Sequence, residues 1–497
     1  MKTIKSLTEA EIAGLPQLSE RWVWVRLDSI GELFCGQSPS IAEVNQEKRG
    51  VPYVTGPEQW DGSKIKETKW TEFPKRLVPE GCIFITVKGA GVGKIFPGVS
   101  CAIGRDIYAF LPSSKVDFKY TLHAIKHQID VLIMKAQGDI PGLSKNHILD
   151  HVIGLCSIEE QRAIVSKIEQ LFSELDNGIS NLKLAQEQLK VYRQAVLKKA
   201  FEGELTKKWR EQQTDLPDAR ELREHIGKER EEAAKNSGKK LNSVKPLTEV
   251  EVNELPRLPN RWRWVKLGEL TDMTSGRAFK KSEYSSHGIK LFQIANVSFG
   301  HTLWDDVVYL PEEYLQKWPE LVLKEGNLLL ALNRPLIQRN LKICTLHKSD
   351  LPAILYQRVG RLDLLSEGLA NYILYFMQGP FFISKFEKDL QGIDIPFINK
   401  GKLLAKQVPI CSKQEMQAIV QEIETRLSVC DKIEQDIETN LEKAEALRQS
   451  ILKKAFEGKL LNERELAEVR GAEDWEPAEV LLERIKAEKA QNGKKIH

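Results

Sequence analysis

The feature that most constrains the fold of this chain is an internal repeat. The phrase AVLKKAFEGEL at 195–205 returns as SILKKAFEGKL at 450–460, an offset of 255 positions. A second pair, KSLTEAEIAGLPQLSERWVWVRL at 5–27 and KPLTEVEVNELPRLPNRWRWVKL at 245–267, has an offset of 240 positions, so the second half carries about fifteen additional residues between these points. The 497 residues therefore form two homologous halves whose ends match and whose middles diverge.

The repeat is also circular. The polar stretch EEAAKNSGKK at 231–240 leads into the entrance of the second half, and KAEKAQNGKK at 486–495 would lead by the same step back to the start of the chain. This order predicts a ring-like object with a pseudo-twofold axis, whose termini meet where the linker would otherwise run.

Each half closes with the pattern of a long helix. Apolar residues recur every seven positions from Ile168 to Val196, and a looser version of the stripe occupies 412–460. At 1.5 Å per residue, about forty-five residues give a rod of roughly 65 Å. A stripe of this length predicts two rods that pack on each other and on a partner's helices. The residues expected to dock the partner are Leu175, Leu182, Leu189, Phe201, Ile437, Leu447 and Phe456.

Two serines are the expected N-caps of these rods. Ser157 and Ser412 are each followed three positions later by a glutamate, Glu160 or Glu415. This is the spacing of a capping box, in which the glutamate bonds back to the backbone of the cap residue.

The segments between entrance and rod have the pattern of α/β recognition modules. GCIFITV at 81–87 and GNLLLAL at 326–332 are apolar runs of the strand type, with glycine and proline around them. Lysine and acidic residues dominate 206–245, which predicts a helix followed by a solvated linker.

Composition limits the class of protein and its compartment. The chain has 73 basic and 70 acidic residues, so a nucleic-acid footprint must be a local patch and not a global excess of charge. No apolar run approaches the roughly eighteen residues of a membrane helix, and the first residues show no signal core. Seven cysteines without a C-x-x-C pair argue against a disulfide framework or a thiolate zinc site. We expect a cytoplasmic protein without membrane contact.

Motifs that would indicate catalysis are incomplete. In VKGAGVGKIF at 87–96 the glycine spacing and Ile95 depart from the phosphate-binding loop, so we interpret this stretch as a tight glycine turn. The histidine pairs His123/His127 and His147/His151 lack both the glutamate of H-E-x-x-H and a third ligand. The sequence has no G-x-S-x-G elbow and no Pro-Pro pair of an amino-methyltransferase loop. We therefore expect no catalytic residue and no metal site.

Basic and amide side chains accompany aromatic residues in both modules. Such mixtures can grip phosphates and read base edges, with Arg and Lys suited to guanine and Asn and Gln to adenine. The candidates for DNA contact are Gln37, Ser38, Lys64, Lys88, Gly89 and Lys94 in the first module, and Arg277, Lys280, Lys281, Asn333, Arg334 and Arg339 in the second.

Taken together, these features resemble the specificity subunit of type I restriction-modification enzymes, over essentially the whole chain. The resemblance is carried by several duplicated phrases in the same order. They are WVWVRLDSIGEL and WRWVKLGEL, GQSPS and SGRAFKKSEY, TVKGAG and LALNRPL, IPGLSKNHI and IPFINKGKL, IEEQRAIVSKIEQLFSELD and KQEMQAIVQEIETRLSVCD, and LKKAFEG twice.

The resemblance implies an α+β fold in which two α/β target-recognition domains are joined by two long antiparallel coiled-coil helices, with a pseudo-twofold internal repeat. Each domain would read one half of a bipartite site in double-stranded DNA. The helices would space the domains and dock two methyltransferase (M) subunits. The M subunits would bring S-adenosylmethionine for adenine methylation, and restriction (R) subunits would add ATP- and magnesium-dependent translocation and cleavage, so this chain itself would bind no cofactor.

On this basis we assign six segments. They are target-recognition domains at 1–156 and 246–411, spacer and docking helices at 157–206 and 412–460, a helix with polar linker at 207–245, and a polar helical tail at 461–497. Motif matching also places Gly36-Gln37-Ser38 opposite Gly276-Arg277-Ala278, and Lys88-Gly89 opposite Asn333-Arg334.

Three alternatives remain at this point. The nearest is a specificity subunit of another class, serving a fused restriction-methylation enzyme. A coiled-coil protein scaffold is supported by the heptads, but the two modules with their glycine and Arg/Lys/Asn loops oppose it. A nucleotide-using enzyme would depend on VKGAGVGK alone.

Overall fold

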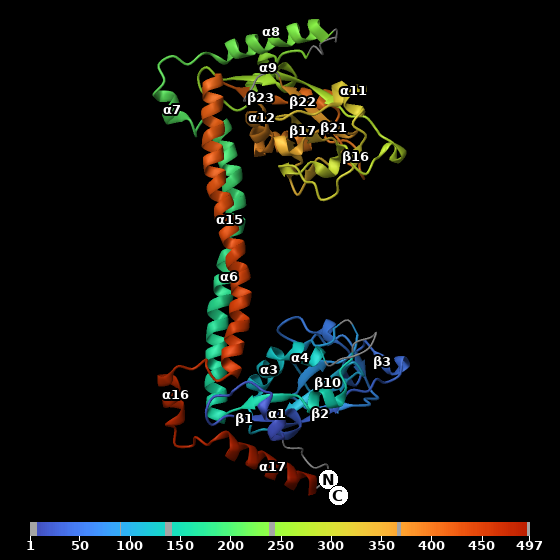
Figure 1. Ribbon diagram of the computed structural model, residues 1–497, viewed down its shortest axis with the longest axis vertical. Helices are drawn as coiled ribbons and strands as arrows, with labels where there is room; N and C mark the ends of the chain where they lie inside the picture. The colour runs from blue at the N-terminus through green and yellow to red at the C-terminus, as the bar shows by residue number, and fades with distance from the viewer. Residues whose placement is uncertain (1–6, 90, 135–141, 238–243, 365–368, 495–497) are drawn as a thin grey trace. The chain divides into compact units, whose positions relative to one another are not determined.

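The computed structural model describes residues 7–89, 91–134, 142–237, 244–364 and 369–494 (Figure 1). The start of the first entrance, Ala90 of the glycine turn, Ile140-Pro141 and the ends of both polar tails lie outside these residues. The chain divides into a first unit, Met1–Leu182 with Glu438–His497, and a second unit, Lys183–Ile437. None of the helices among the described residues combines the length and the apolar character needed to cross a membrane.

The first unit holds one module, the beginning of one rod and the end of the other. Its strands are β1 (Val23–Arg26), β2 (Gly31–Cys35), β3 (Val44–Asn45), β4 (Val51–Val54), β5 (Trp70–Thr71), β6 (Leu77–Val78), β7 (Ile83–Thr86), β8 (Ile95–Pro97), β9 (Cys101–Ile103), β10 (Ile107–Pro112) and β11 (Val152–Leu155). Its helices are α1 (Glu9–Ala13), α2 (Leu27–Ile30), α3 (Phe118–His127), α4 (Ile129–Met134), α5 (Lys145–Leu149), α16 (Glu463–Arg470) and α17 (Ala478–Lys494), with the first part of α6 (Ile158–Phe201) and the last part of α15 (Lys413–Phe456).

The second unit repeats this plan. Its strands are β12 (Arg263–Lys266), β13 (Thr271–Ser275), β14 (Ile289–Phe292), β15 (Phe299–Gly300), β16 (Tyr309–Leu310), β17 (Leu328–Ala331), β18 (Leu336–Ile337), β19 (Asn340–Leu341), β20 (Ile343–Thr345), β21 (Ala353–Leu355), β22 (Val359–Leu364) and β23 (Gln407–Ile410). Its helices are α7 (Lys207–Glu211), α8 (Ala219–Ser237), α9 (Glu249–Asn253), α10 (Leu267–Leu270), α11 (Tyr314–Lys317), α12 (Leu369–Gln378), α13 (Pro380–Glu387) and α14 (Lys400–Leu404), with the remaining parts of α6 and α15.

The sheets of both modules are mixed and mainly antiparallel. In the first unit the strand orders are β2-β10-β7-β8, β3-β5-β4-β9-β6 and β1-β11, and among the described residues only β4 and β9 pair in parallel. In the second unit the orders are β13-β22-β17-β20-β15, β16-β14-β21, β18-β19 and β12-β23. Many paired strands lie far apart in the sequence, such as β2 with β10 and β13 with β22, so these pairs close only when the whole module folds.

The two apolar runs of the sequence are central strands covered on both faces. Strand β7 lies between β10 and β8, and its residues alternate between two cores: Ile83 and Ile85 point into one, and Phe84 into the other. Strand β17 does the same with Leu328 and Leu330 on one side and Leu329 on the other. Burial of both faces explains why these strands show no polar alternation.

The rods run antiparallel to each other within each unit. In the first unit Asp176 of α6 bonds with Arg448 of α15, and in the second unit Arg193 of α6 lies 2.7 Å from Asp431 of α15. Both the arginines and the aspartates are separated by 255 positions, so one ion pair occurs twice with its partners exchanged between the helices.

The repeated phrase LKKAFEG ends each rod and attaches it to a module. Gly203 and Gly458 have φ of 75° and 71°, a left-handed conformation that stops the helix one turn before the ends expected from sequence. Phe201 is 7% exposed and packs edge-on against Tyr372 and Phe376, while Phe456 is 6% exposed. Phe201 and Phe456, which were expected to dock a partner, are thus buried, and the two glycines reverse the chain after them.

A clamp fastens the start of each rod to the entrance of its module. Ser157 Oγ caps α6, but the carboxylate of Glu160 accepts hydrogen bonds from Trp22 Nε1 and Arg470 Nε, both at 2.7 Å. In the second unit Ser412 caps α15, and Glu415 accepts from Trp262 Nε1 at 2.9 Å and Arg210 Nε at 2.8 Å. The expected capping box is thus replaced by a buried contact between three distant segments.

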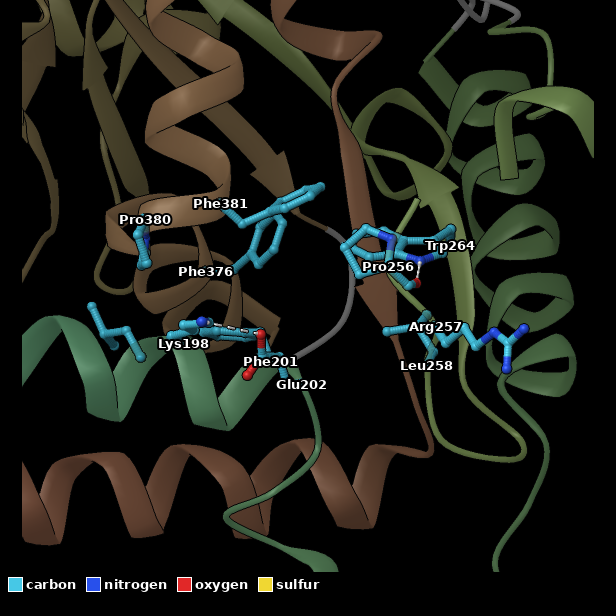
Figure 2. A pocket seen from close by; sticks show the side chains of 12 residues that line it. Lys198, Phe201, Glu202, Pro256, Arg257, Leu258, Trp264, Phe376, Pro380 and Phe381 are labelled. Carbon is cyan, nitrogen blue, oxygen red and sulfur yellow. Dashed lines mark hydrogen bonds and ion pairs between the residues drawn. The ribbon is translucent and has the colours of Figure 1, made fainter. Parts of the chain in front are cut away.

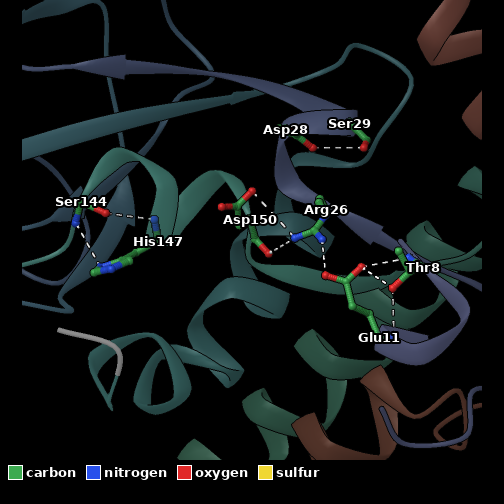
Figure 3. Close-up of polar contacts among 8 residues, drawn as sticks. All are labelled: Thr8, Glu11, Arg26, Asp28, Ser29, Ser144, His147 and Asp150. Carbon is green, nitrogen blue, oxygen red and sulfur yellow. Dashed lines mark hydrogen bonds and ion pairs between the residues drawn. The ribbon is translucent and has the colours of Figure 1, made fainter. Parts of the chain in front are cut away.

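The entrances are fixed by a second duplicated network. In Figure 3, Glu11 closes a capping box with Thr8 and accepts a bond of 2.6 Å from Arg26. The corresponding pair in the second unit is Lys266 and Glu251, 3.1 Å apart. These interactions hold α1 and α9 on the strands that start each module.

The polar tails pack on the modules as helices. Lys489 Nζ of α17 donates to the carbonyls of Asp28 and Gly31, both at 2.6 Å, at the end of α2. In the second unit Arg230 of α8 donates to the carbonyl of Gly268 in α10 at 2.6 Å. A cation at the C-terminus of a helix is favourable, and each tail closes the unit to which it belongs.

Candidate nucleic-acid interface

The loop after the first long strand has the same geometry in both units. Gly36 donates to the carbonyl of Ile107 at 3.1 Å, and Gly276 donates to that of Val359 at 3.3 Å. A Cβ atom at Gly36 would lie 2.0 Å from the carbonyl oxygen of Gly104, and one at Gly276 would lie 2.1 Å from that of Tyr356. Glycine is therefore required for close backbone approach, and the side chains that follow are carried outward.

Residues 87–89 and 91–94 of the glycine-rich stretch lie between the paired strands β7 and β8, where its interpretation as a turn places them. Lys88 and Lys94 are exposed, and Gly89 has a φ of 81°. Together with Thr55, Glu58, Asp106 and neighbouring residues, they line an open cavity of about 480 Å³. This side of the first unit thus presents two unburied cations around a polar hollow.

The second unit has a longer excursion at the same place, with the small hairpin β18–β19. Arg334, Gln338 and Arg339 adopt φ of 44°, 49° and 62°, which L-residues rarely do. The backbone N–H of Arg334 donates to the carbonyl of Pro396 at 2.6 Å, and Asn333 forms a bridge with Phe397. The exposed tip thus carries Gln338 and Arg339 on a short two-stranded ribbon.

The candidate loops of each unit converge on one turn between two strands. In the first unit the N–H of Gln37 donates to Ile103 and that of Val87 to Asp106, so both loops flank the turn 104–106 between β9 and β10. In the second unit the N–H of Gln357 donates to Arg277 and that of Leu332 to Arg358, around the turn 356–358 between β21 and β22.

An aromatic support holds the first candidate arginine of the second unit. The guanidinium carbon of Arg277 lies 4.0 Å from the centroid of the Trp318 ring and 5.7 Å from that of Phe279. Arg277 remains exposed. Stacking of this kind fixes the plane of the guanidinium while its donors stay free for a ligand.

The remaining candidate lysines lie on tight polar turns. The backbone N–H groups of Lys64 and Ser63 lower the pKa of Asp61 to about 2, which stabilises the turn that carries Lys64. The backbone N–H of Lys280 donates to Glu283 at 2.7 Å and lowers the pKa of that carboxyl. Lys64, Lys280 and Lys281 are exposed on these turns.

The structure adds residues that sequence reasoning missed: Arg105 in the first turn, and Gln357 and Arg358 in the second. The equivalence of the turns rests on the hydrogen bonds described above, in which Ile107 and Asp106 of the first unit take the roles of Val359 and Arg358, 252 positions later. That offset matches neither of the two offsets of the well-preserved phrases. The tyrosines Tyr120 and Tyr372 share it, and both donate to a carbonyl of the last module strand, so they were the available signal.

The residues expected to dock a partner have unequal exposure. Leu447 is 51% exposed, Leu175, Leu182 and Leu189 are half-buried, and Ile437 is 4% exposed. Phe201 and Phe456 belong to the cores of their own units. Buried side chains of this kind cannot meet another protein without rearrangement. Further exposed apolar side chains lie on the rods at Leu184, Val191, Tyr192, Val429 and Ile433.

A separate apolar cavity of about 330 Å³ lies in the second unit at the end of α6 (Figure 2). Trp264 and Phe381 pack with their ring centroids 5.1 Å apart, and Trp264 Nε1 donates to the carbonyl of Pro256 at 2.9 Å. In the first unit the position equivalent to Gly379 is His127, whose ring stacks on Phe456 at 5.6 Å. The cavity thus reflects a missing ring, and its apolar walls distinguish it from the basic loops.

The histidine pairs have structural surroundings. Burial lowers the pKa of His123 to about 4, and His147 lies in the capping box of α5 with Ser144. Among the residues that the structure describes, no group of three or more His, Cys, Asp or Glu side chains could hold a metal ion.

Fold and loops together define a class of protein: a duplicated recognition protein in which two mixed modules, each with a basic and amide-rich loop cluster, are built on a shared pair of long helices. A family model described as the type I restriction modification DNA specificity domain matches residues 19–184 and 259–443, and the chain belongs to this family.

Relatives in sequence support the assignment over nearly the full length. The type I restriction enzyme MjaVIII specificity subunit of Methanocaldococcus jannaschii is 30% identical over 464 residues, covering 93% of this chain and 97% of the relative. The EcoBI specificity subunit of Escherichia coli is 21% identical over 506 residues, covering 99% and 98% of the two chains.

Solved structures share the fold. A chain from a study of complex assembly and conformational transition of the type I R-M system has a TM-score of 0.64 at 17% identity, covering 90% of this chain and all of the other. The HsdS subunit from Thermoanaerobacter tengcongensis has a TM-score of 0.56 at 18% identity, covering 90% and 99%. The α+β fold with duplicated modules and long paired helices is therefore confirmed, and the family decides against a coiled-coil scaffold.

Proposed function

We propose that each unit reads one half of a bipartite site in double-stranded DNA through the loops that converge on the turns 104–106 and 356–358. The proposal is carried by one observation: an equivalent hydrogen-bonded frame in both units supports different side chains. Gln37, Ser38, Lys88 and Lys94 surround this frame in the first unit. In the second unit it carries Arg277, Asn333, Arg334 and Arg339. Arginine, lysine and amide side chains are the donors that phosphates and base edges accept.

Two methyltransferase subunits are the proposed partners on the rods. Leu184 and Val191 are spaced seven positions apart on α6 and are 57% and 70% exposed, and Val429 and Ile433 are four apart on α15 and are 56% and 42% exposed. Residues at these spacings share a helix face, so each rod presents an apolar strip. Such strips favour a helical partner, which supports docking outside the seam between the rods.

Chemistry is assigned to the partners. We propose that the methyltransferase subunits bind S-adenosylmethionine and methylate adenine, that restriction subunits use ATP and magnesium, and that this chain binds none of these. Support comes from the relatives, which carry the name specificity subunit of type I restriction enzymes. The chain then contributes sequence recognition and assembly.

Exchange of one module tests the proposal. Replacing Trp262 to Ile410 by the equivalent module of a relative keeps both rods and both tails. In cells that carry the hybrid with its methyltransferase subunits, methylome sequencing should show one half of the methylated sequence changed and the other half retained.

The matched control for damage at the junctions is a second hybrid in which only residues 267–404 are exchanged. It keeps the strands β12 and β23 of this chain. Both hybrids should give the same new half-site. A change in both halves of the methylated sequence would contradict independent reading by the two units.

A further inference from the structure

The turns 104–106 and 356–358 are held from equivalent sides in the two units. The backbone N–H of Gly104 donates to Val54 at 2.8 Å, and that of Tyr356 donates to Phe292 at 3.0 Å, each at the end of a neighbouring parallel strand. The two candidate loops complete the frame in each unit. Each turn is therefore rigid in its backbone although it lies on the surface.

The side chains on this frame differ between the units. Gly104-Arg105-Asp106 in the first unit takes the place of Tyr356-Gln357-Arg358 in the second. The side chain of Arg105 is 76% exposed, and Arg358 is exposed as well. A fixed backbone with interchangeable polar side chains is the arrangement that a recognition element needs, because the frame sets the position and the side chain sets the preference.

The backbone of Arg358 has a conformation that is unfavourable for a residue other than glycine. Its φ of 68° lies in the left-handed region, which glycine adopts freely and which strains a residue with a Cβ atom. Its guanidinium makes no hydrogen bond or ion pair with any residue in the described ranges. The strain is thus not compensated by contacts of the side chain within the chain, and such strain gathers at functional sites.

Neighbouring groups prepare the surface beside Arg358. Its carbonyl accepts from the N–H of Leu332, next to Asn333, and the N–H of Gln357 donates to the carbonyl of Arg277, whose guanidinium stacks on Trp318. The turn that carries Arg358 therefore also carries the amide side chain of Gln357, and its backbone is bonded to Arg277, whose guanidinium stacks on Trp318.

From this placement we infer that the two turns are the base-reading elements of the protein, with Arg358 in the second unit and Arg105 in the first contacting base edges. This inference rests on the proposed reading of one half-site by each unit. An arginine can donate two bonds to the O6 and N7 atoms of guanine, so each turn should read a G·C pair. Lys88 and Lys94 of the first unit and Arg334 of the second contact the phosphates of the DNA backbone.

Three substitutions of Arg358 in the complete complex test the inference by methylome sequencing and DNA binding. Arg358→Ala should relax the preference at one G·C position of one half-site by about 5- to 150-fold, and Arg358→Lys should relax it less, since lysine keeps donors and charge but lacks the fixed fork of the guanidinium. Arg358→Gly should relax the same position and also raise the melting temperature of the free chain, because glycine relieves the strained φ. Arg105→Ala should relax a position in the other half-site.

Matched controls separate strain and charge from reading. Lys48 of the first unit has a φ of 61°, so Lys48→Gly should raise the melting temperature without changing the half-site read by the second unit. Lys348 is an exposed cation of the second unit outside the loops, and Lys348→Ala should leave the methylated sequence unchanged.

Two outcomes would overturn the inference. If Arg358→Ala weakens binding equally for all sequences and Arg358→Lys restores it, the side chain meets a phosphate and does not read a base. If all three variants methylate the wild-type sequence with wild-type preference, the turn takes no part in recognition. Failure of the proposed function would instead show in the module exchange, in which neither half-site would follow the exchanged module.

Discussion

Single carboxylates fix how each rod meets its module. The side chains of Glu160 and Glu415 are 2% and 3% exposed, and each satisfies an indole N–H and a guanidinium that come from different parts of the chain. A buried carboxylate with several donors is strongly favoured only while all of them are present. These residues therefore act as the points at which entrance, rod and tail are assembled.

Replacement of one clamp carboxylate should destabilise its unit. In Glu415→Gln the amide cannot accept from all of Trp262, Arg210 and Thr206, so at least one donor loses its acceptor. We expect a loss of about 2–3 kcal/mol in the free energy of unfolding, below the full cost of an uncompensated buried charge because Arg210 is partly exposed. Hydrogen exchange of the amides in β12 and β23 would measure it.

Glu422 on the same helix provides the control. Its ion pair with Arg426 is partly exposed, with side chains 38% and 39% exposed, so Glu422→Gln should change the stability by at most about 0.5 kcal/mol. Equal effects of the two substitutions would show that burial of the clamp does not matter.

The first unit should lose stability in mild acid through His123. Burial, together with Lys126, lowers the pKa of this histidine to about 4, against about 6.5 in an unfolded chain. The unfolded state then binds a proton more readily than the folded state. The contribution of His123 is therefore complete above pH 6.5 and is lost as the pH falls toward 4, by up to about 3 kcal/mol.

Chemical unfolding of the first unit between pH 7 and 4.5 measures this slope. His123→Gln should flatten it, while part remains because burial also lowers the pKa of His127. A slope that is unaltered by the substitution would mean that His123 is hydrated in the folded state.

At the scale of elements, the rods present different surfaces to each other and to solvent. Sequence periodicity identified the ends of the seam: Ile168 and Val196 are buried where heptads place them, while the heptad leucines between them are half-buried. The same periodicity could not show that Leu184 and Val191 stay exposed, because both seam and outer strip repeat every seven residues. Only the packed pair of helices distinguishes the two faces.

Charges placed on the outer strip should prevent docking. Leu184→Glu with Val191→Glu alters two exposed positions, so the stability of the chain should change by no more than about 0.5 kcal/mol per site. Binding of the methyltransferase subunits, measured by native mass spectrometry or titration, should weaken about 10-fold or more.

The control variant is Lys183→Glu, which adds negative charge on the same helix about 100° away from Leu184. It should leave binding nearly unchanged. Wild-type assembly of the double variant would remove this strip of α6 from the docking surface.

The sequence predicted the strands whose position follows from local composition, and it missed the turns whose position depends on contacts with distant residues. The apolar runs that became β7 and β17 are central strands between two cores, so composition alone identified them. The turn 356–358 depends on bonds to Phe292, Arg277 and Leu332, which lie far from it in sequence. Sequence therefore identified the loops of the candidate site but not the residues on which they converge.

At the scale of the whole molecule, both rods pass from one unit into the other, α6 after Leu182 and α15 after Ile437. Seven residues inserted at both points keep both partners of each Arg–Asp pair within one unit. The insertion also preserves the heptad repeat. Each helix lengthens by about 10 Å.

If the rods set the spacing of the half-sites, methylome sequencing of the double insertion should show both halves unchanged and the gap between them longer by up to about three base pairs, at 3.4 Å each. Insertion in one rod alone should abolish assembly, because the two stripes then lose register. An active double insertion with the original gap would assign the spacing to the partners.

The twofold ion pair between the rods has a consequence for how such a protein can diverge. The ion pairs Arg193–Asp431 and Arg448–Asp176 are equivalent contacts, and one gene encodes their residues at separate positions. In a dimer of identical chains every mutation would alter both halves together, and the two recognition surfaces would have to stay alike. Here each copy mutates by itself, so one half can acquire a new sequence preference while the other keeps its own.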